Sequence, residues 1–229
     1  MKTIMTDNVW FPPLNVAAHY EVDFAGITPP KKAEEMMATA MAVAGIQAMQ
    51  KKQYWVQAVS DTEGSPDART ICCDSSVNGA APLCYQQDVE VVTYTAHSSK
   101  ESLASFVANT KLSANKAYDE LTTILVNVQT NVRLPSKEDW SNILGATGKN
   151  NPVLVLGRIK KDAPEYKLAI VYPVFEGALD YNLPKLLKSL PHSKAMKWSI
   201  GTKDKQTDDD SENHCPFEKL GVTCALLQG

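Results

Sequence analysis

The chain has little excess of either charge. Its 23 lysines and arginines stand against 26 aspartates and glutamates, which leaves a net charge of −3 over 229 residues. A strongly basic surface is what draws proteins onto phosphate backbones and anionic lipid. We therefore expect no binding to nucleic acid.

Long apolar runs are also missing. The most apolar stretch covers residues 36–49, about 14 residues, whereas a membrane-spanning helix needs roughly 20. Residues 1–14 include Asp7 and a pair of prolines, and they contain no continuous apolar segment of the kind found in a secretory signal. We expect no transmembrane segment. Export then requires that the numbered chain is a mature or excised form.

Motifs for common cofactors are absent as well. Gly145 and Gly148 are separated by two residues, whereas a phosphate-binding loop has four, and Asn150 stands where Ser or Thr is required. The acidic run at 208–212 lacks the alternating ligands and central glycine of a calcium-binding loop. We expect no cofactor.

Cysteine, by contrast, is present five times, and two of the five flank a hairpin signal. Asn78-Gly79 is the strongest short hairpin signal, because both central residues of a tight turn need positive φ. Counting outward from this turn places Cys73 opposite Cys84. Opposed residues in such a ladder have Cα atoms roughly 4.5 to 5.5 Å apart, within the reach of a disulfide. We therefore predict a Cys73–Cys84 disulfide.

Pro82 lacks the backbone donor that a strict ladder needs, and this favours a slipped or bulged register. The alternative to the disulfide is two buried thiols in a strand. For the second bridge, either Cys215 pairs with Cys224, or Cys72 forms a long-range bridge to one of these two, and the spacing alone does not decide. Disulfides persist in oxidising compartments, so we expect a secreted protein. A cytoplasmic protein with reduced thiols is the alternative.

The pattern of elements predicts one α+β domain over residues 1–229, because helices and strands are mixed without βαβ regularity. Prolines and Gly26 punctuate residues 1–30, which we expect to form an extended arm. Residues 36–49 are rich in methionine and alanine and are apolar nearly all round. Such a helix is buried, although a groove-binding or membrane-inserting element is the alternative.

A long amphipathic helix is predicted over residues 99–133. Ser98 and Glu101 have the spacing of a capping box, and apolar side chains then recur in steps of four and three. Pro135 ends the pattern. We expect this helix to pack against the Met/Ala-rich helix among antiparallel hairpins. A homodimer through the helix 99–133 is the alternative, because sustained heptads also suit a partner copy.

Further elements follow from β-branched runs and turn residues. Strands are predicted over 88–96, 153–159, 166–175 and 196–200, and short helices over 140–144 and 181–190. Residues 53–59 are predicted as either a helix continuation or a short strand. Ser136 and Asp139 favour a cap before the first of the two short helices.

Few side chains have the spacing that chemistry requires. His97 lies where a strand gives way to a helix, a position where loops often carry catalytic groups, so it is a candidate catalytic residue. His214, Cys215 and Cys224 are candidate zinc ligands, although no Cys-x-x-Cys pair accompanies them.

No acid/base pair, nucleophile or metal cluster emerges from these patterns. The sequence therefore favours a non-catalytic binding protein, secreted and disulfide-stabilised like a toxin or effector, which contacts an unidentified protein or membrane surface. The alternative is a hydrolase whose site is assembled around His97 from residues distant in sequence.

Overall fold

The computed structural model describes most of the first 189 residues and a short segment near the end of the chain. The described residues are 10–23, 29–50, 52–59, 66–74, 83–98, 100–116, 118–159, 165–175, 177–189 and 225–226.

A mixed sheet forms the centre of the fold, and its seven main strands lie in chain order. They are β1 Gln53–Ala58, β2 Ala68–Asp74, β3 Leu83–Tyr94, β4 Thr123–Val128, β5 Val153–Arg158, β6 Glu165–Tyr172 and β7 Gly177–Asn182. The pairs from β1 to β3 and from β5 to β7 are antiparallel, whereas β3, β4 and β5 are parallel. A short strand, β8 Ala225–Leu226, pairs with β3. This is the predicted α+β class.

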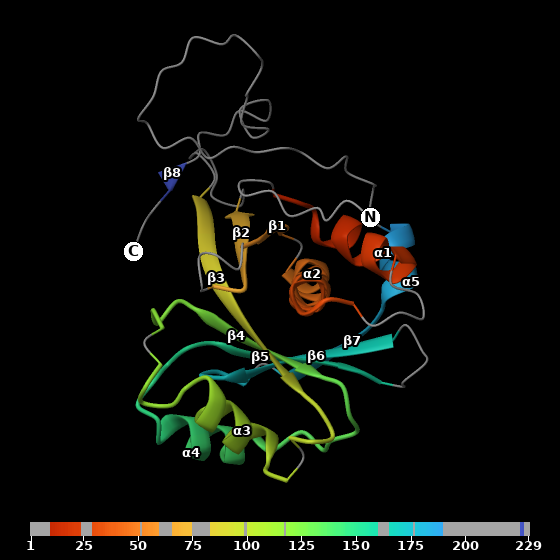
Figure 1. Cartoon of the computed structure of the whole chain (residues 1–229). Helices are drawn as coiled ribbons and strands as arrows, with labels where there is room; N and C mark the ends of the chain where they lie inside the picture. Colours follow the sequence, from red (N-terminus) through yellow and green to blue (C-terminus); the bar gives the residue numbers. More distant parts are fainter. Residues whose placement is uncertain are drawn as a thin grey trace.

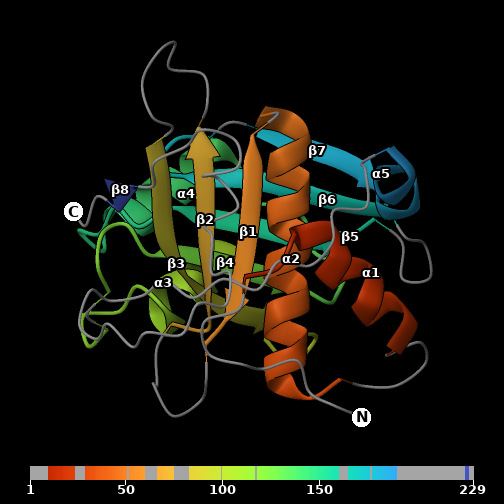
Figure 2. The same ribbon diagram turned by 90° about the horizontal axis from the view of Figure 1, so that it is seen from above.

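Helices cover both faces of the sheet. The helices are α1 Pro13–Asp23, α2 Lys31–Gln50, α3 Leu103–Thr110, α4 Lys137–Gly145 and α5 Leu183–Ser189. The sheet curls around α2, with α1 beside that helix, α5 next to α1 and β7, and α3 and α4 on the opposite face (Figures 1 and 2). Helix α2 accordingly contacts strands near both ends of the sheet, from β1 to β7.

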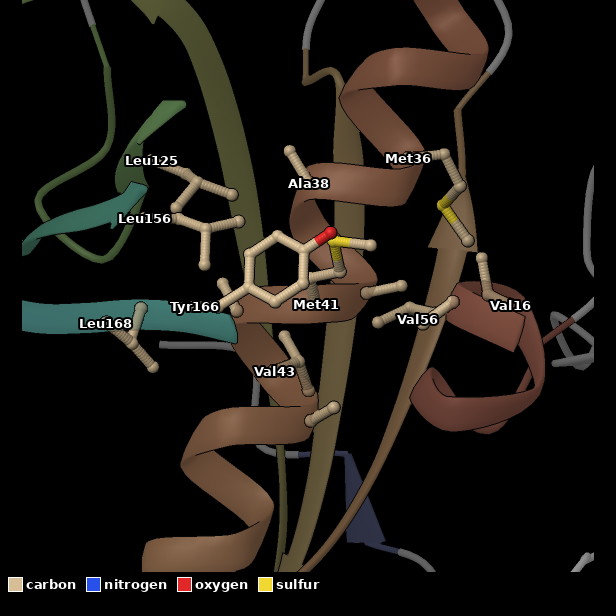
Figure 3. Packing of buried hydrophobic residues seen from close by; sticks show 14 of the residues in the cluster. Val16, Met36, Ala38, Met41, Val43, Val56, Leu125, Leu156, Tyr166 and Leu168 are labelled. Atoms are coloured by element: carbon tan, nitrogen blue, oxygen red, sulfur yellow. The ribbon is translucent and has the colours of Figure 1, made fainter. Parts of the chain in front are cut away.

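The concave face holds the larger hydrophobic core, and α2 lies at its centre. The Met/Ala-rich helix is buried as predicted, because the curled sheet leaves almost no side of it exposed. Figure 3 shows Met41 beside the ring of Tyr166, with Val56 and Leu168 contributed by distant strands. The hydroxyl of Tyr181 donates to the carbonyl oxygen of Met41 at 2.7 Å, so β7 is tied to the helix backbone.

The convex face carries a second core beneath α3 and α4. Phe106 and Trp140 from these helices pack over Val126 and Val155 of the parallel strands. Ser136 caps α4, and its hydroxyl accepts from the Asp139 amide at 3.1 Å, while the Asp139 carboxylate accepts from the Ser136 amide at 3.0 Å. The predicted cap at this helix is confirmed and proves to be a full capping box.

The predicted helix over 99–133 is wrong. Its first part forms the short helix α3, capped by Ser102 rather than by Ser98, and its later part forms β4. Ile124, Leu125 and Val126 are all fully buried, because α2 lies on one face of β4 while α3 and α4 lie on the other. A strand covered on both faces is apolar throughout, so its apolar residues also occupy the positions expected for the apolar stripe of an amphipathic helix. The homodimer proposed through that helix therefore loses its basis.

Two parallel crossovers were missed for the same reason. The chain runs from β3 through α3 to β4, and then through α4 to β5. With residues 123–128 assigned to a helix, no βαβ unit could be recognised.

The N-terminal segment also differs from its prediction. Residues 13–23, expected within an extended arm, form α1, and Pro13 occupies the first helical position that proline favours. Phe11 pairs with Val56 of β1 through two backbone hydrogen bonds of 2.8 Å. Of the two alternatives for residues 53–59, the strand is the one observed, over 53–58. The short helix predicted over 181–190 begins later, at Leu183, because β7 extends to Asn182. The predicted strand 196–200 lies outside the described residues.

Gly45 lies where α2 packs closely against the sheet. A Cβ at this position would lie 3.0 Å from both Leu168 Cδ2 and Tyr181 Cε1, whereas a Cβ at Gly145 would meet nothing within 4 Å. We expect Gly45→Leu to lower the free energy of unfolding by about 1–3 kcal/mol through overpacking. Gly145→Leu is the matched control and should leave it unchanged. Urea denaturation measures both, and equal losses would contradict the packing described.

Candidate functional site

A cavity of about 350 Å³ lies between α2 and the concave face of the sheet. This volume falls within the range of small-ligand sites. The described residues that line it come from α2 and from the segments β1 to β6: Thr39, Ala42, Val43, Ile46, Gln50, Tyr54, Thr70, Gln87, Val89, Thr123, Leu125, Pro152, Leu154 and Ile170.

Short side chains on both walls create the cavity. Helix α2 presents Thr39 and Ala42 towards the space, and β2 and β4 present Thr70 and Thr123. None of these side chains reaches as far as the methionines and leucines that fill the neighbouring core. Small residues therefore face one another across the gap between helix and sheet, and the gap stays open.

The hydroxyls of two cavity-lining threonines, Thr70 and Thr123, have no partner among the described residues. Thr70 and Thr123 are each only 5% exposed, and neither side chain hydrogen-bonds to any residue that the structure describes. Thr39 differs, because its hydroxyl donates to the Glu35 carbonyl oxygen at 2.9 Å. An unpaired hydroxyl that faces a cavity is available to hydrogen-bond to water or to a guest molecule.

The mouth of the cavity is polar but uncharged. Gln50 is exposed, and Tyr54 and Gln87 are partly exposed. The Tyr54 hydroxyl donates to Gln50 Oε1 at 2.7 Å. No Asp, Glu, Lys, Arg, His or Cys is found among the described lining residues. The site thus offers apolar surface and neutral hydrogen-bonding groups, without a counter-ion for a charged ligand.

Charged residues gather instead near the first turn of α2. Asp67, just before β2, accepts from the backbone amide of Val91 at 2.8 Å and also lies 3.7 Å from Lys32 Nζ of α2. Lys32 in turn lies 3.6 Å from Glu35 Oε2. Burial raises the pKa of the Glu35 carboxyl, the nearby charge of Asp67 raises it further, and Lys31 and Lys32 oppose the shift.

The ion pairs continue to the other face of the sheet. Lys111, which follows α3, lies 3.7 Å from Asp67 Oδ2 and 2.7 Å from Oε2 of the buried Glu90. The Tyr118 hydroxyl donates to the same Glu90 oxygen at 3.3 Å, and burial followed by the Glu90 charge raises the pKa of this phenol. We call Glu35, Lys32, Asp67, Lys111 and Glu90 the ionic chain. It joins α2 to the α3 side of the sheet.

A separate contact holds α2 over the parallel strands. Oε1 of Glu34 accepts from Thr93 Oγ1 at 3.1 Å, from Asn127 Nδ2 at 3.1 Å and from Gln129 Nε2 at 2.6 Å. Thr93 and Asn127 are paired residues of β3 and β4. Together with the ionic chain, this contact fixes the first turn of α2 and so positions the cavity-lining residues further along the helix.

His97 lies in the turn that follows β3, and no catalytic partner accompanies it among the residues that the structure describes. The residue is exposed, and its imidazole makes no hydrogen bond or ion pair with a described residue. It lines neither the cavity beneath α2 nor the cavity at the ends of β4 and β5 discussed below.

The cysteine hairpin has the predicted backbone register. Cys73 is paired with Cys84 and Asp74 with Leu83 in the antiparallel ladder of β2 and β3. The side chains of Cys73 and Cys84 lie outside the described part, so the disulfide stays a prediction. Cys72 is half-buried, and no disulfide occurs among the side chains that are described.

The proposed zinc ligands His214, Cys215 and Cys224 fall outside the described residues, as does a Cys215–Cys224 bridge. Within the described ranges, no group of three or more His, Cys, Asp or Glu side chains is arranged to hold a metal ion. The same ranges contain no helix with the length and apolar character needed to cross a membrane.

The cavity could not be predicted from the sequence, because the residues that line it follow no periodic pattern along the chain. Thr70 and Thr123 belong to strands far apart in the sequence, and each looks like an ordinary β-branched strand residue. Only their position opposite the small residues of α2 distinguishes them.

We expect the free energy of unfolding to fall markedly when Lys111, the lysine at the centre of the ionic chain, is replaced. Lys111→Met leaves Glu90 and Asp67 without this cation, and breaking a buried pair costs about 3–5 kcal/mol. The control is Lys167→Met, because Lys167 and Asp180 form a pair with side chains 44% and 58% exposed, for which the cost is about 0–1 kcal/mol. Urea unfolding at neutral pH separates these outcomes, and a Lys111→Met loss no larger than that of the control would refute the role given to Lys111.

Comparison with known proteins gives no family for this chain. No family model, no curated protein and no solved structure matches it. The geometry of the cavity is therefore the basis on which a function is assigned.

Proposed function

We propose that the protein is a non-catalytic binding protein, and that its ligand is a small, uncharged, largely apolar molecule held in the cavity beneath α2. The observation that carries this proposal is that two buried residues, Thr70 and Thr123, line a cavity of about 350 Å³ with hydroxyls that no described residue hydrogen-bonds. An empty apolar cavity would need no such groups.

The lining defines the chemistry of the ligand. Val43, Leu125 and Leu154 supply apolar walls, so most of the ligand surface is hydrocarbon. The two threonine hydroxyls can donate to a carbonyl or hydroxyl oxygen of the ligand. A charged ligand would lose its hydration without gaining a counter-ion, and this loss opposes its entry.

The same lining supports binding rather than catalysis. Proton transfer and covalent catalysis at neutral pH rely on groups such as His, Asp, Glu, Lys or Cys, and the described lining residues include none of them. The hydrolase alternative around His97 has no comparable observation in its favour.

We also propose that the protein is exported and acts on a protein or membrane partner, like a toxin or effector. This proposal rests on the opposition of Cys73 and Cys84 in the ladder, which is the backbone arrangement that a disulfide needs. Export and ligand binding are independent proposals, and each has its own test.

Ligand binding can be tested with prodan, an uncharged naphthalene that carries a carbonyl and whose emission reports hydrogen bonding. We expect saturable binding to the wild type, and a loss of affinity of about fivefold in Thr70→Val/Thr123→Val, since a neutral hydrogen bond contributes about 0.5–1.5 kcal/mol. The free energy of unfolding should stay the same or rise, because no described residue hydrogen-bonds to these hydroxyls. Fluorescence titration and urea denaturation measure the two effects.

Two further variants sharpen this experiment. Thr110→Val removes a hydroxyl that donates to the Phe106 carbonyl oxygen on the far side of the sheet, and prodan affinity should not change. Ala42→Leu fills the cavity from the helix side and should abolish binding. If prodan binds Ala42→Leu as well as it binds the wild type, the ligand does not occupy this cavity.

The export proposal predicts that Cys73 and Cys84 resist alkylation until the protein is reduced. Mass spectrometry of alkylated peptides, prepared from unreduced and reduced protein, measures this directly. Replacing Cys73 by Ser should release Cys84 for alkylation without reductant, whereas Cys72→Ser should leave the pair protected. Alkylation of both residues in the unreduced wild type would exclude the bridge and remove the basis for export.

A further inference from the structure

A second cavity, of about 440 Å³, lies at the carboxyl ends of β4 and β5. The loop 130–134, which leads from β4 towards α4, forms one wall, and the end of β5 together with Lys167 of β6 forms the other. The carboxyl edge of parallel strands is where ligands bind in α/β sheets, because the loops that follow the strands converge there.

The lining of this cavity is cationic. Arg133, Arg158 and Lys167 all line it, and no Asp or Glu is present among the described lining residues. The chain as a whole has a net charge of −3, so this concentration of positive charge runs against its overall composition.

The three cations differ in how far they are already engaged. Lys167 Nζ lies 3.2 Å from Asp180 Oδ1, and the Arg158 guanidinium lies over the Tyr166 ring, 5.4 Å from its centroid. Arg133 makes no ion pair or hydrogen bond with a described residue. It interacts electrostatically with Asp139, whose carboxylate is already engaged in the capping box of α4.

Neutral donors stand beside Arg133. The side chains of Thr130 and Asn131 also line the cavity and make no hydrogen bond to a described residue. A guanidinium with adjacent amide and hydroxyl groups matches the several oxygens of a carboxylate or phosphate.

The remainder of the lining is apolar. Val128, Val132 and Leu134 border the convex core, and Val155 lies buried on β5. Gly157 is paired with Val128 and adds no side chain, so the floor of the cavity stays open between the strand ends.

We propose that this cavity is a second binding site and that it takes a small organic anion. Its oxyanion head is held by Arg133 and Lys167, with help from Asn131, and its apolar body lies against the valines. This ligand differs in charge from the neutral molecule assigned to the cavity beneath α2, so the two sites are chemically distinct and independent.

Two dyes with the same aromatic skeleton separate the sites. 8-Anilinonaphthalene-1-sulfonate carries an anionic group that N-phenyl-1-naphthylamine lacks. We expect Arg133→Gln/Lys167→Gln to weaken binding of the sulfonated dye about tenfold or more, since hydrogen bonds to charged groups contribute about 1.5–3 kcal/mol each. Binding of the neutral dye should be unaffected. Lys137→Gln, which removes an exposed lysine of α4 outside the lining, is the control and should change neither affinity.

Competition then defines the anion. Benzoate and phenyl phosphate should both displace the sulfonated dye, and inorganic phosphate should do so much more weakly because it lacks an apolar body. The proposal is overturned if Lys137→Gln weakens the sulfonated dye as much as the double variant does, since a general surface field would then explain binding. It is equally overturned if Ala42→Leu abolishes binding of the sulfonated dye, which would place this dye beneath α2.

Discussion

The burial of α2 within the curled sheet is the constraint on which the rest of the structure depends. A helix that is apolar nearly all round needs apolar surface on several sides, and a flat sheet would cover only one of them. The strands therefore wrap the helix, from β1 to β7, and Gly45 lets the ring of Tyr181 and the side chain of Leu168 approach the helix backbone. Helices α3 and α4 lie on the outside of the curl, over the second core (Figure 1).

The two halves of α2 have different tasks. Its first turn carries Lys32 and Glu34, which bind the helix to the sheet side through an ion pair with Asp67 and hydrogen bonds to the strands, and Glu35 in the next turn pairs with Lys32. Buried ion pairs contribute little net stability, because desolvation offsets the attraction, but they define one position for the helix. The second half of α2 has small and apolar side chains and leaves the cavity open. Charge at one end thus holds in place the neutral site at the other.

The two proposed sites are built from the same strands. Successive residues of a strand point to opposite faces of a sheet, so Leu154 lines the cavity beneath α2 while Val155 lines the cavity at the strand ends. Strand β4 likewise contributes Leu125 to one cavity and Val128 to the other. The concave cavity is covered by a helix and has no charged residue in its described lining, whereas the other is bordered by a loop that can present arginine to water. Their ligands are expected to differ for this reason.

Local patterns in the sequence determined the buried Met/Ala-rich helix, the cap of α4 and the opposition of Cys73 and Cys84, because each depends on residues that are close neighbours along the chain. The assignment of residues 123–128 was decided only by tertiary structure. Their apolar spacing satisfies both a helix and a strand covered on two faces, and the presence of helices on both faces selects the strand. The cavity beneath α2 could not be predicted either, since it exists only where Thr70 and Thr123, remote in sequence, meet the small residues of the helix across the curl of the sheet.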